Sequence, residues 1–216
     1  MMIHMKKFNL LLLGCLISFF SLAQKARVIS GSITTNTTFY SDTIYTLDGY
    51  VYVKNNAILT IQPGTVVKGK SGAKSTLVVT RNGSIQANGT ASRPIVFTSE
   101  KPVGQRNKGD WGGVVILGKA IINRPTDCTT CPGSAVAASE AGIQNAVEGD
   151  LDNASGDALY GGTDNNHSSG VFRYVRIEFA GTVITPGNEI NGLTMGGVGK
   201  GTNMEYVQVS FADDDG

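Results

Sequence analysis

Short runs of apolar and β-branched residues alternate with tight turns between Val51 and Gly89. A run of this kind that ends in an Asn or Gly turn predicts a strand followed by a corner. Aligning the turns places Asn56, Gly64 and Gly83 in one column, separated by 8 and then 19 residues. The short step predicts neighbouring corners of one coil, and the long step predicts a nearly complete coil. A strand–corner–strand unit that returns at about 20 residues is typical of a solenoid of stacked parallel strands.

The same pattern continues along the chain. We expect further coils at 94–99, 111–122, 171–181 and 204–212, and the last two share Tyr, Val, Phe and Ala at equivalent positions. Val114–Leu117 is an uninterrupted apolar strand, which is expected where both faces of a strand are covered. Because no long amphipathic helix accompanies these strands, the sequence predicts an all-β parallel β-helix.

The pattern also divides the chain into parts. We expect a signal peptide at 1–23, an N-terminal cap region at 24–50, and parallel coils over 51–216 with a long loop insertion at 123–170. A cap is expected because the first coil of a solenoid is exposed unless something covers it. The chain reaches Gly216 without a closing cap, which predicts that it is the N-terminal part of a longer β-helix.

The first 23 residues have the features of an export signal. Two lysines precede the apolar run over 8–22, and Ser21-Leu22-Ala23 offers small residues for cleavage before Gln24. Lipidation of Cys15 is the alternative, because Leu12-Leu13-Gly14-Cys15 resembles a lipobox. The apolar run is shorter than the roughly 20 residues of a membrane span. We therefore expect a secreted or outer-surface protein without a transmembrane span in the mature chain.

Composition narrows the choice of partners. Glycine makes up 28 of 216 residues, and only 16% of residues are charged, as expected for many short strands joined by turns. The net charge of +1 provides no basic surface, so we expect no nucleic-acid partner. The mature chain keeps Cys128 and Cys131, and in an exported protein this pair predicts a disulfide. Pro132-Gly133 follows at once, which argues against a redox motif.

The insertion carries the main chemical candidates. Its acidic side chains, accompanied by Asn and Gly, are the hard oxygen ligands that suit Ca²⁺. The candidate Ca²⁺ ligands are Glu148, Asp150, Asp152, Asp157 and Asp164. A solvated acidic loop is the alternative. A short helix is expected at 135–146, and His167 is expected to lie on an exposed loop without a catalytic role.

Three residues are assigned a structural role. Gly64 and Gly83 form corners of the coil, where a glycine turn is favoured. Trp111, the only tryptophan, precedes a glycine pair and is expected to anchor a corner or the core. A sugar-stacking platform is the alternative for this side chain.

Several segments, taken in order, resemble one family. They read LTIQPGTVVKG, ANGTASRPIVFTS, WGGVVILGKA, YGGTDNNHSSGVFRYVRIEFAG, NEINGLTMGGVGKGT and EYVQVSFADDDG. The chain from about Tyr50 onward is similar to the large right-handed parallel β-helix surface proteins secreted by Gram-negative bacteria. The resemblance implies a pectin lyase-like fold, an adhesin-like role at the cell surface and export by the type IX pathway. It also implies further coils after the last segment.

Two functions of different classes remain open. The favoured one is a non-enzymatic surface scaffold that presents the loop at 123–170 to glycan or cell-surface ligands. The alternative is a secreted polysaccharide lyase or hydrolase of the β-helix type, with carboxylates at 213–215 and a basic residue at Arg173 or Arg176. No complete catalytic motif accompanies these residues, so the sequence assigns no catalytic residue.

Overall fold

The computed structural model describes residues 24–123, 136–139 and 142–213. The described residues form strands, turns and loops but no helix. The predicted signal peptide and the Cys128–Cys131 pair lie outside them. The strands are β1 (Lys25–Ile33), β2 (Thr37–Phe39), β3 (Thr43–Val53), β4 (Ile58–Ile61), β5 (Val66–Gly69), β6 (Thr76–Val79), β7 (Ser84–Asn88), β8 (Ile95–Ser99), β9 (Gly113–Leu117), β10 (Val136–Ser139), β11 (Gly142–Ala146), β12 (Leu159–Tyr160), β13 (Gly170–Glu178), β14 (Val183–Thr185), β15 (Asn188–Glu189), β16 (Leu193–Gly196) and β17 (Asn203–Ser210).

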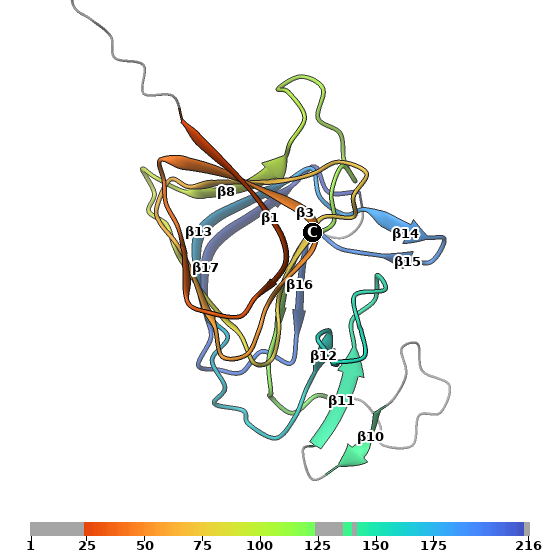
Figure 1. Cartoon of the computed structure of the whole chain (residues 1–216). Coiled ribbons are helices and arrows are strands. Elements are labelled where there is room, and N and C mark those ends of the chain that lie inside the picture. Colours follow the sequence, from red (N-terminus) through yellow and green to blue (C-terminus); the bar gives the residue numbers. More distant parts are fainter. Residues whose placement is uncertain (1–23, 124–135, 140–141, 214–216) are drawn as a thin grey trace, which may run out of the picture.

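Parallel pairing arranges the strands in three stacks. The first face joins the ends of β1 and β3 to β6, β9 and β16. The second face joins β2, β4, β7 and the beginnings of β13 and β17. The third face joins the beginnings of β1 and β3 to β5, β8 and the ends of β13 and β17. The chain therefore coils as a parallel β-helix, as predicted (Figure 1).

The core lies inside the coil. Alternate residues of the strands are buried, for example in β5 and β7, because successive side chains of a strand point to opposite faces. Aromatic rings stack in the interior: Phe39 lies on Tyr45 with ring centroids 3.9 Å apart, and Phe97 lies on Phe172 at 6.1 Å. The apolar stripe that predicts each strand is thus the stripe that fills the coil.

The register of the coils differs from the sequence alignment of the corners. The Asn56 amide donates to the Asn82 carbonyl, so these two residues occupy one corner in successive coils. Leu59 pairs with Ile85, which gives this coil 26 residues. Gly64 belongs to the next corner, beside Arg93, and the assignment of the 19-residue step to a full coil is wrong. The turn after β5 lengthens the coil at the third corner, which the apolar pattern does not record.

The later repeat has the predicted register. Phe172 pairs with Met204, so the shared Tyr and Phe residues fall at equivalent corners. Tyr174 stacks on Tyr206 at 4.4 Å between ring centroids, and Phe179 stacks on Phe211 at 5.1 Å. All four residues have positive φ angles, a conformation that bulky side chains rarely adopt. Stacking along the axis accompanies this strained backbone and explains why the two segments share aromatic residues.

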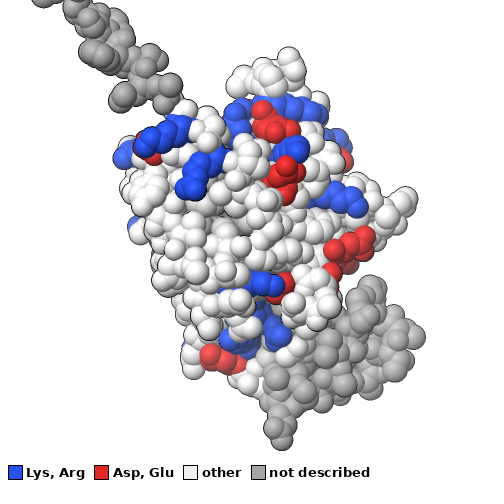
Figure 2. Space-filling model, in the orientation of Figure 1, with Lys and Arg blue, Asp and Glu red and all other residues white. Residues whose placement is uncertain are grey.

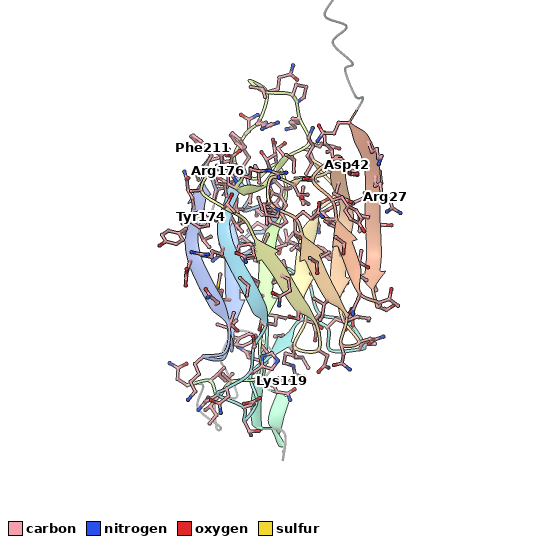
Figure 3. All side chains as sticks on the ribbon, turned by 90° about the vertical axis from the view of Figure 1, so that its left-hand side faces the viewer. Arg27, Asp42, Lys119, Tyr174, Arg176 and Phe211 are labelled. Carbon is pink, nitrogen blue, oxygen red and sulfur yellow. The ribbon has the colours of Figure 1, made fainter. Side chains whose placement is uncertain are left out.

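The region at 24–50 follows the coil path rather than forming a separate cap. β1 pairs in parallel with β3 along two faces, and β2 pairs with β4. Most of β1 is exposed, as expected of an outermost strand. Figure 3 shows β1 as the first rung, with the other strands lying side by side behind it.

The insertion leaves the coil after β9 and returns at β13. Residues 135–146 do not form the expected helix, because β10 and β11 pair antiparallel and β11 also pairs with β12. The pairing of Ala146 with Leu159 is nonlocal, so the local composition did not indicate it. Residues of the insertion pack against the outer side of the first face. This second apolar cluster contains Tyr52, Val78, Val115, Leu117, Leu151, Ala158 and Ile190. Val114–Leu117 is buried on both sides, as its uninterrupted apolar sequence predicts.

Polar contacts fix the insertion on the first face. The Tyr50 hydroxyl donates to the Gly149 carbonyl at 3.0 Å, and the Tyr52 hydroxyl donates to the Leu151 carbonyl at 2.7 Å. The Lys54 ammonium lies 2.5 Å from a carboxylate oxygen of Asp157. Burial raises the pKa of Tyr52 to about 12, so this hydroxyl keeps its proton and remains a donor at neutral pH. Three alternate residues of β3 and its following turn thus hold a segment about 100 residues away.

Replacing Tyr52 by phenylalanine should loosen the insertion without unfolding the coil. The change leaves the buried Leu151 carbonyl without its donor, which costs about 1–2 kcal/mol. Hydrogen exchange of amides in 147–161 should accelerate by roughly the corresponding factor, while amides of β6 and β7 stay protected. Tyr50→Phe is the matched control and should have a smaller effect, because its hydroxyl is less buried. Equal exchange in the wild type and Tyr52→Phe would contradict the anchoring role.

Candidate functional site

A groove lies between the insertion and the first face. Its cavity has a volume of about 240 Å³ and is bounded by the end of β11, by β12, by β15 and by β16. We call it the insert groove. Its lining residues are Asn145, Ala146, Val147, Glu148, Tyr160, Glu189, Asn191, Thr194, Met195 and Gly196.

Tyr160 is held in place on the groove wall. A Cβ atom at Gly196 would lie 2.6 Å from Cγ of the Tyr160 ring, so only glycine allows the ring to rest on β16. The Asn145 amide donates to the Tyr160 hydroxyl at 3.0 Å. The ring is also packed against the second apolar cluster. The groove therefore has one preorganised aromatic wall with a polar tip.

Carboxylates line the other side of the groove. Glu148 is exposed and Glu189 is half-buried, and neither side chain makes a hydrogen bond or an ion pair with the described part of the chain. A second cavity of about 470 Å³ adjoins at Val147 and Glu148 and adds Asp150 and Asp152. No lysine or arginine belongs to the described residues that line these two cavities. Acidic side chains gather below the β14–β15 hairpin at the right-hand edge of Figure 2.

The geometry suits a ligand rich in hydroxyl groups. The side chains of Asn145 and Asn191 offer amide donors and acceptors, while Glu148 and Glu189 offer strong acceptors. Tyr160 adds an aromatic surface next to them. Two carboxylates without partners on one cavity are also the groups that general acid–base chemistry on a glycosidic bond uses.

The five candidate Ca²⁺ ligands do not converge. Asp157 pairs with Lys54 and accepts from Asn153, while Asp152 accepts the Ala158 amide at 3.0 Å. Asp150 accepts from the Asn188 side chain at 3.2 Å. Asp164 lines a different pocket, on the other side of the insertion from Glu148. Throughout the described ranges, no three His, Cys, Asp or Glu side chains form a group that could hold a metal ion.

The chain was then compared with known proteins. A family model for the pectate-lyase-like β-helix domain matches residues 31–216. The chain belongs to the pectate-lyase-like β-helix family. A search of curated proteins and a search of solved structures each found no match. Membership of this β-helix family agrees with the three stacked faces, and it leaves the ligand to be argued from the site.

The basic residues considered for lyase chemistry are engaged elsewhere. Arg173 pairs with Glu205 at 2.9 Å and lies over the rings of Tyr174 and Tyr206. Arg176 pairs with Glu178 at 3.2 Å on the third face. Asp213 pairs with Lys108, and its two neighbouring aspartates lie outside the described residues. None of these side chains lines the insert groove.

Several groove residues carried no recognisable signal in the sequence. Glu189 lies on the short hairpin strand β15, more than 40 residues after Glu148, and only the coil brings the two to one cavity. Asn145 and Tyr160 lie in a segment without a strand pattern. The one available signal was the uninterrupted apolar strand β9, which indicates that the insertion covers the first face. Trp111 is fully buried, so it presents no surface for a sugar to stack on.

Proposed function

We propose that this protein is a secreted or outer-surface β-helix that binds a glycan in the insert groove without cleaving it. The observation that carries the proposal is the combination of a fixed aromatic wall with unpartnered polar groups on one cavity. Parallel coils form a rigid support, and ligand sites on such supports occur on the segments that leave the coil. The basic and apolar sequence at 1–23 supports export. No helix in the described parts of the chain is long and apolar enough to cross a membrane.

The charge of the groove selects among glycans. The two adjoining cavities are lined by Glu148, Asp150, Asp152 and Glu189, with no cation among their described lining residues. Like charges repel most strongly where a low-dielectric wall separates them from solvent. The ligand is therefore a neutral or amine-bearing glycan rather than a polyuronate. A lyase that removes a proton next to a carboxylate would need a basic residue in this groove.

Glycoside hydrolysis is a second candidate function. It is favoured by Glu148 and Glu189, which line one cavity and have no partners within the described ranges. In this mechanism one carboxyl group protonates the leaving oxygen, and the other activates water or attacks the sugar. The half-buried Glu189 is the candidate acid, because partial burial favours the neutral form of a carboxyl group.

Binding and cleavage are separated by one experiment on the exported chain. Calorimetry with a neutral β-glucan, cationic chitosan and polygalacturonate should detect binding to one of the first two and none to polygalacturonate. Asn191→Ala should weaken that binding about 5- to 10-fold through the loss of a hydrogen bond. Asp48→Asn is the control, because this carboxylate pairs with Lys70 on the surface, away from the groove. No binding to any neutral or cationic glycan would refute the proposal.

Glutamine variants decide between the two candidates. For a binding protein, reducing sugar is not released by the wild type, and Glu189→Gln has no turnover to lose. For a hydrolase, the wild type releases reducing sugar and either Glu148→Gln or Glu189→Gln lowers the rate by at least about 100-fold. Binding that weakens on addition of EDTA would support the Ca²⁺ ligation that the acidic loop suggests.

A further inference from the structure

A second pocket lies at the corner between the first and second faces. It has a volume of about 310 Å³, and its walls include Arg81, Lys119, Gln144, Gly161 and Asp164. We call it the corner pocket. Arg81 and Lys119 follow β6 and β9, so they occupy the same corner in successive coils.

Two cations of this pocket lack carboxylate partners. Arg81 is half-buried, and its Nη1 donates to the Gly161 carbonyl at 3.0 Å. Lys119 is also half-buried. Over the described ranges, neither side chain forms an ion pair. Burial lowers the pKa of the Arg81 guanidinium, which nevertheless stays charged at neutral pH. Partly desolvated cations gain most from an anion that replaces the lost hydration.

His167 borders the same cations. Its Nδ1 atom is buried and has no hydrogen-bond partner in the described part of the chain. Burial and the neighbouring Lys119 ammonium lower the pKa of this imidazole, and its other contact is with the Arg81 backbone. His167 is therefore neutral at physiological pH. It leaves the charge of the pocket to Arg81 and Lys119.

Asp164 is the carboxylate among the lining residues. Its Oδ1 accepts the Asn166 amide at 2.9 Å, and the residue is exposed. It neutralises one of the two cationic charges at most. The described lining therefore keeps a net positive charge, in contrast with the insert groove.

We propose that the corner pocket binds an oxyanion, namely the sulfate or carboxylate group of an acidic glycan or a free inorganic anion. A planar guanidinium and an ammonium on one cavity recognise such a group by charge-assisted hydrogen bonds. The amide of Gln144 adds a neutral donor on the wall of the pocket. The ligand chemistry differs from that of the insert groove, so the two proposals stand independently.

The pocket and the groove lie on opposite sides of the insertion. Gln144 lines the corner pocket, whereas the next residue of β11, Asn145, lines the insert groove. Gly161 and Tyr160 are divided in the same way. This division is expected because consecutive residues of a strand face opposite sides. Variants of one site therefore leave the side chains of the other in place.

Binding of dextran sulfate to the exported chain tests the proposal. Calorimetry should detect binding that weakens with added salt, and uncharged dextran should not bind. Lys119→Gln should reduce the affinity about 10-fold or more, as expected for the loss of a charge-assisted hydrogen bond. Lys68→Gln and Arg27→Gln are matched controls, because neither residue forms an ion pair in the described structure and both lie away from the pocket. Figure 3 shows Lys119 at the lower end of the coil and Arg27 on the outermost strand β1.

The outcomes distinguish the sources of the anion. Inorganic sulfate that binds alone and displaces dextran sulfate supports an oxyanion site filled by either source. Binding of inorganic sulfate without dextran sulfate supports a site for small ions only. Dextran sulfate that binds equally well to wild type and Lys119→Gln, or no binding of either probe, would overturn the proposal. Glu189→Gln should leave this binding unchanged, so a failed groove does not affect the result.

Discussion

Replacing Trp111 by alanine should lower the free energy of unfolding by about 3–5 kcal/mol. The side chain is fully buried, and its indole Nε1 donates to the Glu178 carbonyl at 2.9 Å. A Cβ atom built on Gly69 would lie 2.5 Å from Trp111, which shows how closely the ring packs on β5. The substitution therefore creates a cavity between the loop before β9 and the third face, and it leaves a carbonyl without its donor.

Urea denaturation followed by circular dichroism measures this loss, because the variant contains no tryptophan for fluorescence. Trp111→Phe is the matched control. It keeps an aromatic ring in the site but removes the hydrogen bond to Glu178, and it should cost about 1–3 kcal/mol less than alanine. A Trp111→Ala variant within about 0.5 kcal/mol of wild type would show that the corner is not anchored by the indole.

Replacing Gly83 by alanine should destabilise the coil by about 2–3 kcal/mol or more. A Cβ atom at this position would lie 2.0 Å from the Val53 carbonyl oxygen of the preceding coil. The same carbonyl accepts the Thr80 amide at 3.1 Å, and the Asn56 amide donates to the Asn82 carbonyl beside it. The added methyl group must separate two coils at the corner where their backbones meet.

Gly49→Ala is the matched control for Gly83→Ala. Gly49 has a positive φ of 75°, but a Cβ atom there would meet no other atom within 4 Å. Its substitution costs only the backbone strain, about 1 kcal/mol. Both free energies of unfolding are measured by urea denaturation under the same conditions. Equal losses in the two variants would contradict the close approach of the coils at Gly83.

The sequence predicted the coil correctly because burial in a strand has a short period. Inward-facing residues such as Leu59 and Ile85 alternate with outward-facing ones, and this alternation is readable from local sequence alone. The spacing of Phe172 and Met204 is readable for the same reason, since both segments repeat the same residues. Even the covered outer side of β9 is evident from its uninterrupted apolar run.

The registers of the coils could not be predicted in the same way. They depend on how many residues each corner holds, and the corner after β5 adds residues that carry no apolar pattern. The column of Asn56, Gly64 and Gly83 therefore combined two different corners. The short helix expected at 135–146 failed for a related reason, because the partner strand β12 lies outside that window.

The sequence by itself determined that this chain forms strands, which side of each strand enters the core, and that β9 is covered on both sides. The tertiary structure alone decided where the chemistry lies. Tyr50 reaches a carbonyl 99 residues away, and similarly distant segments bring Glu148 to Glu189 and Arg81 to the insertion. Contacts of this range depend on the summed lengths of all intervening turns, whereas burial of a side chain depends only on its immediate neighbours in the strand.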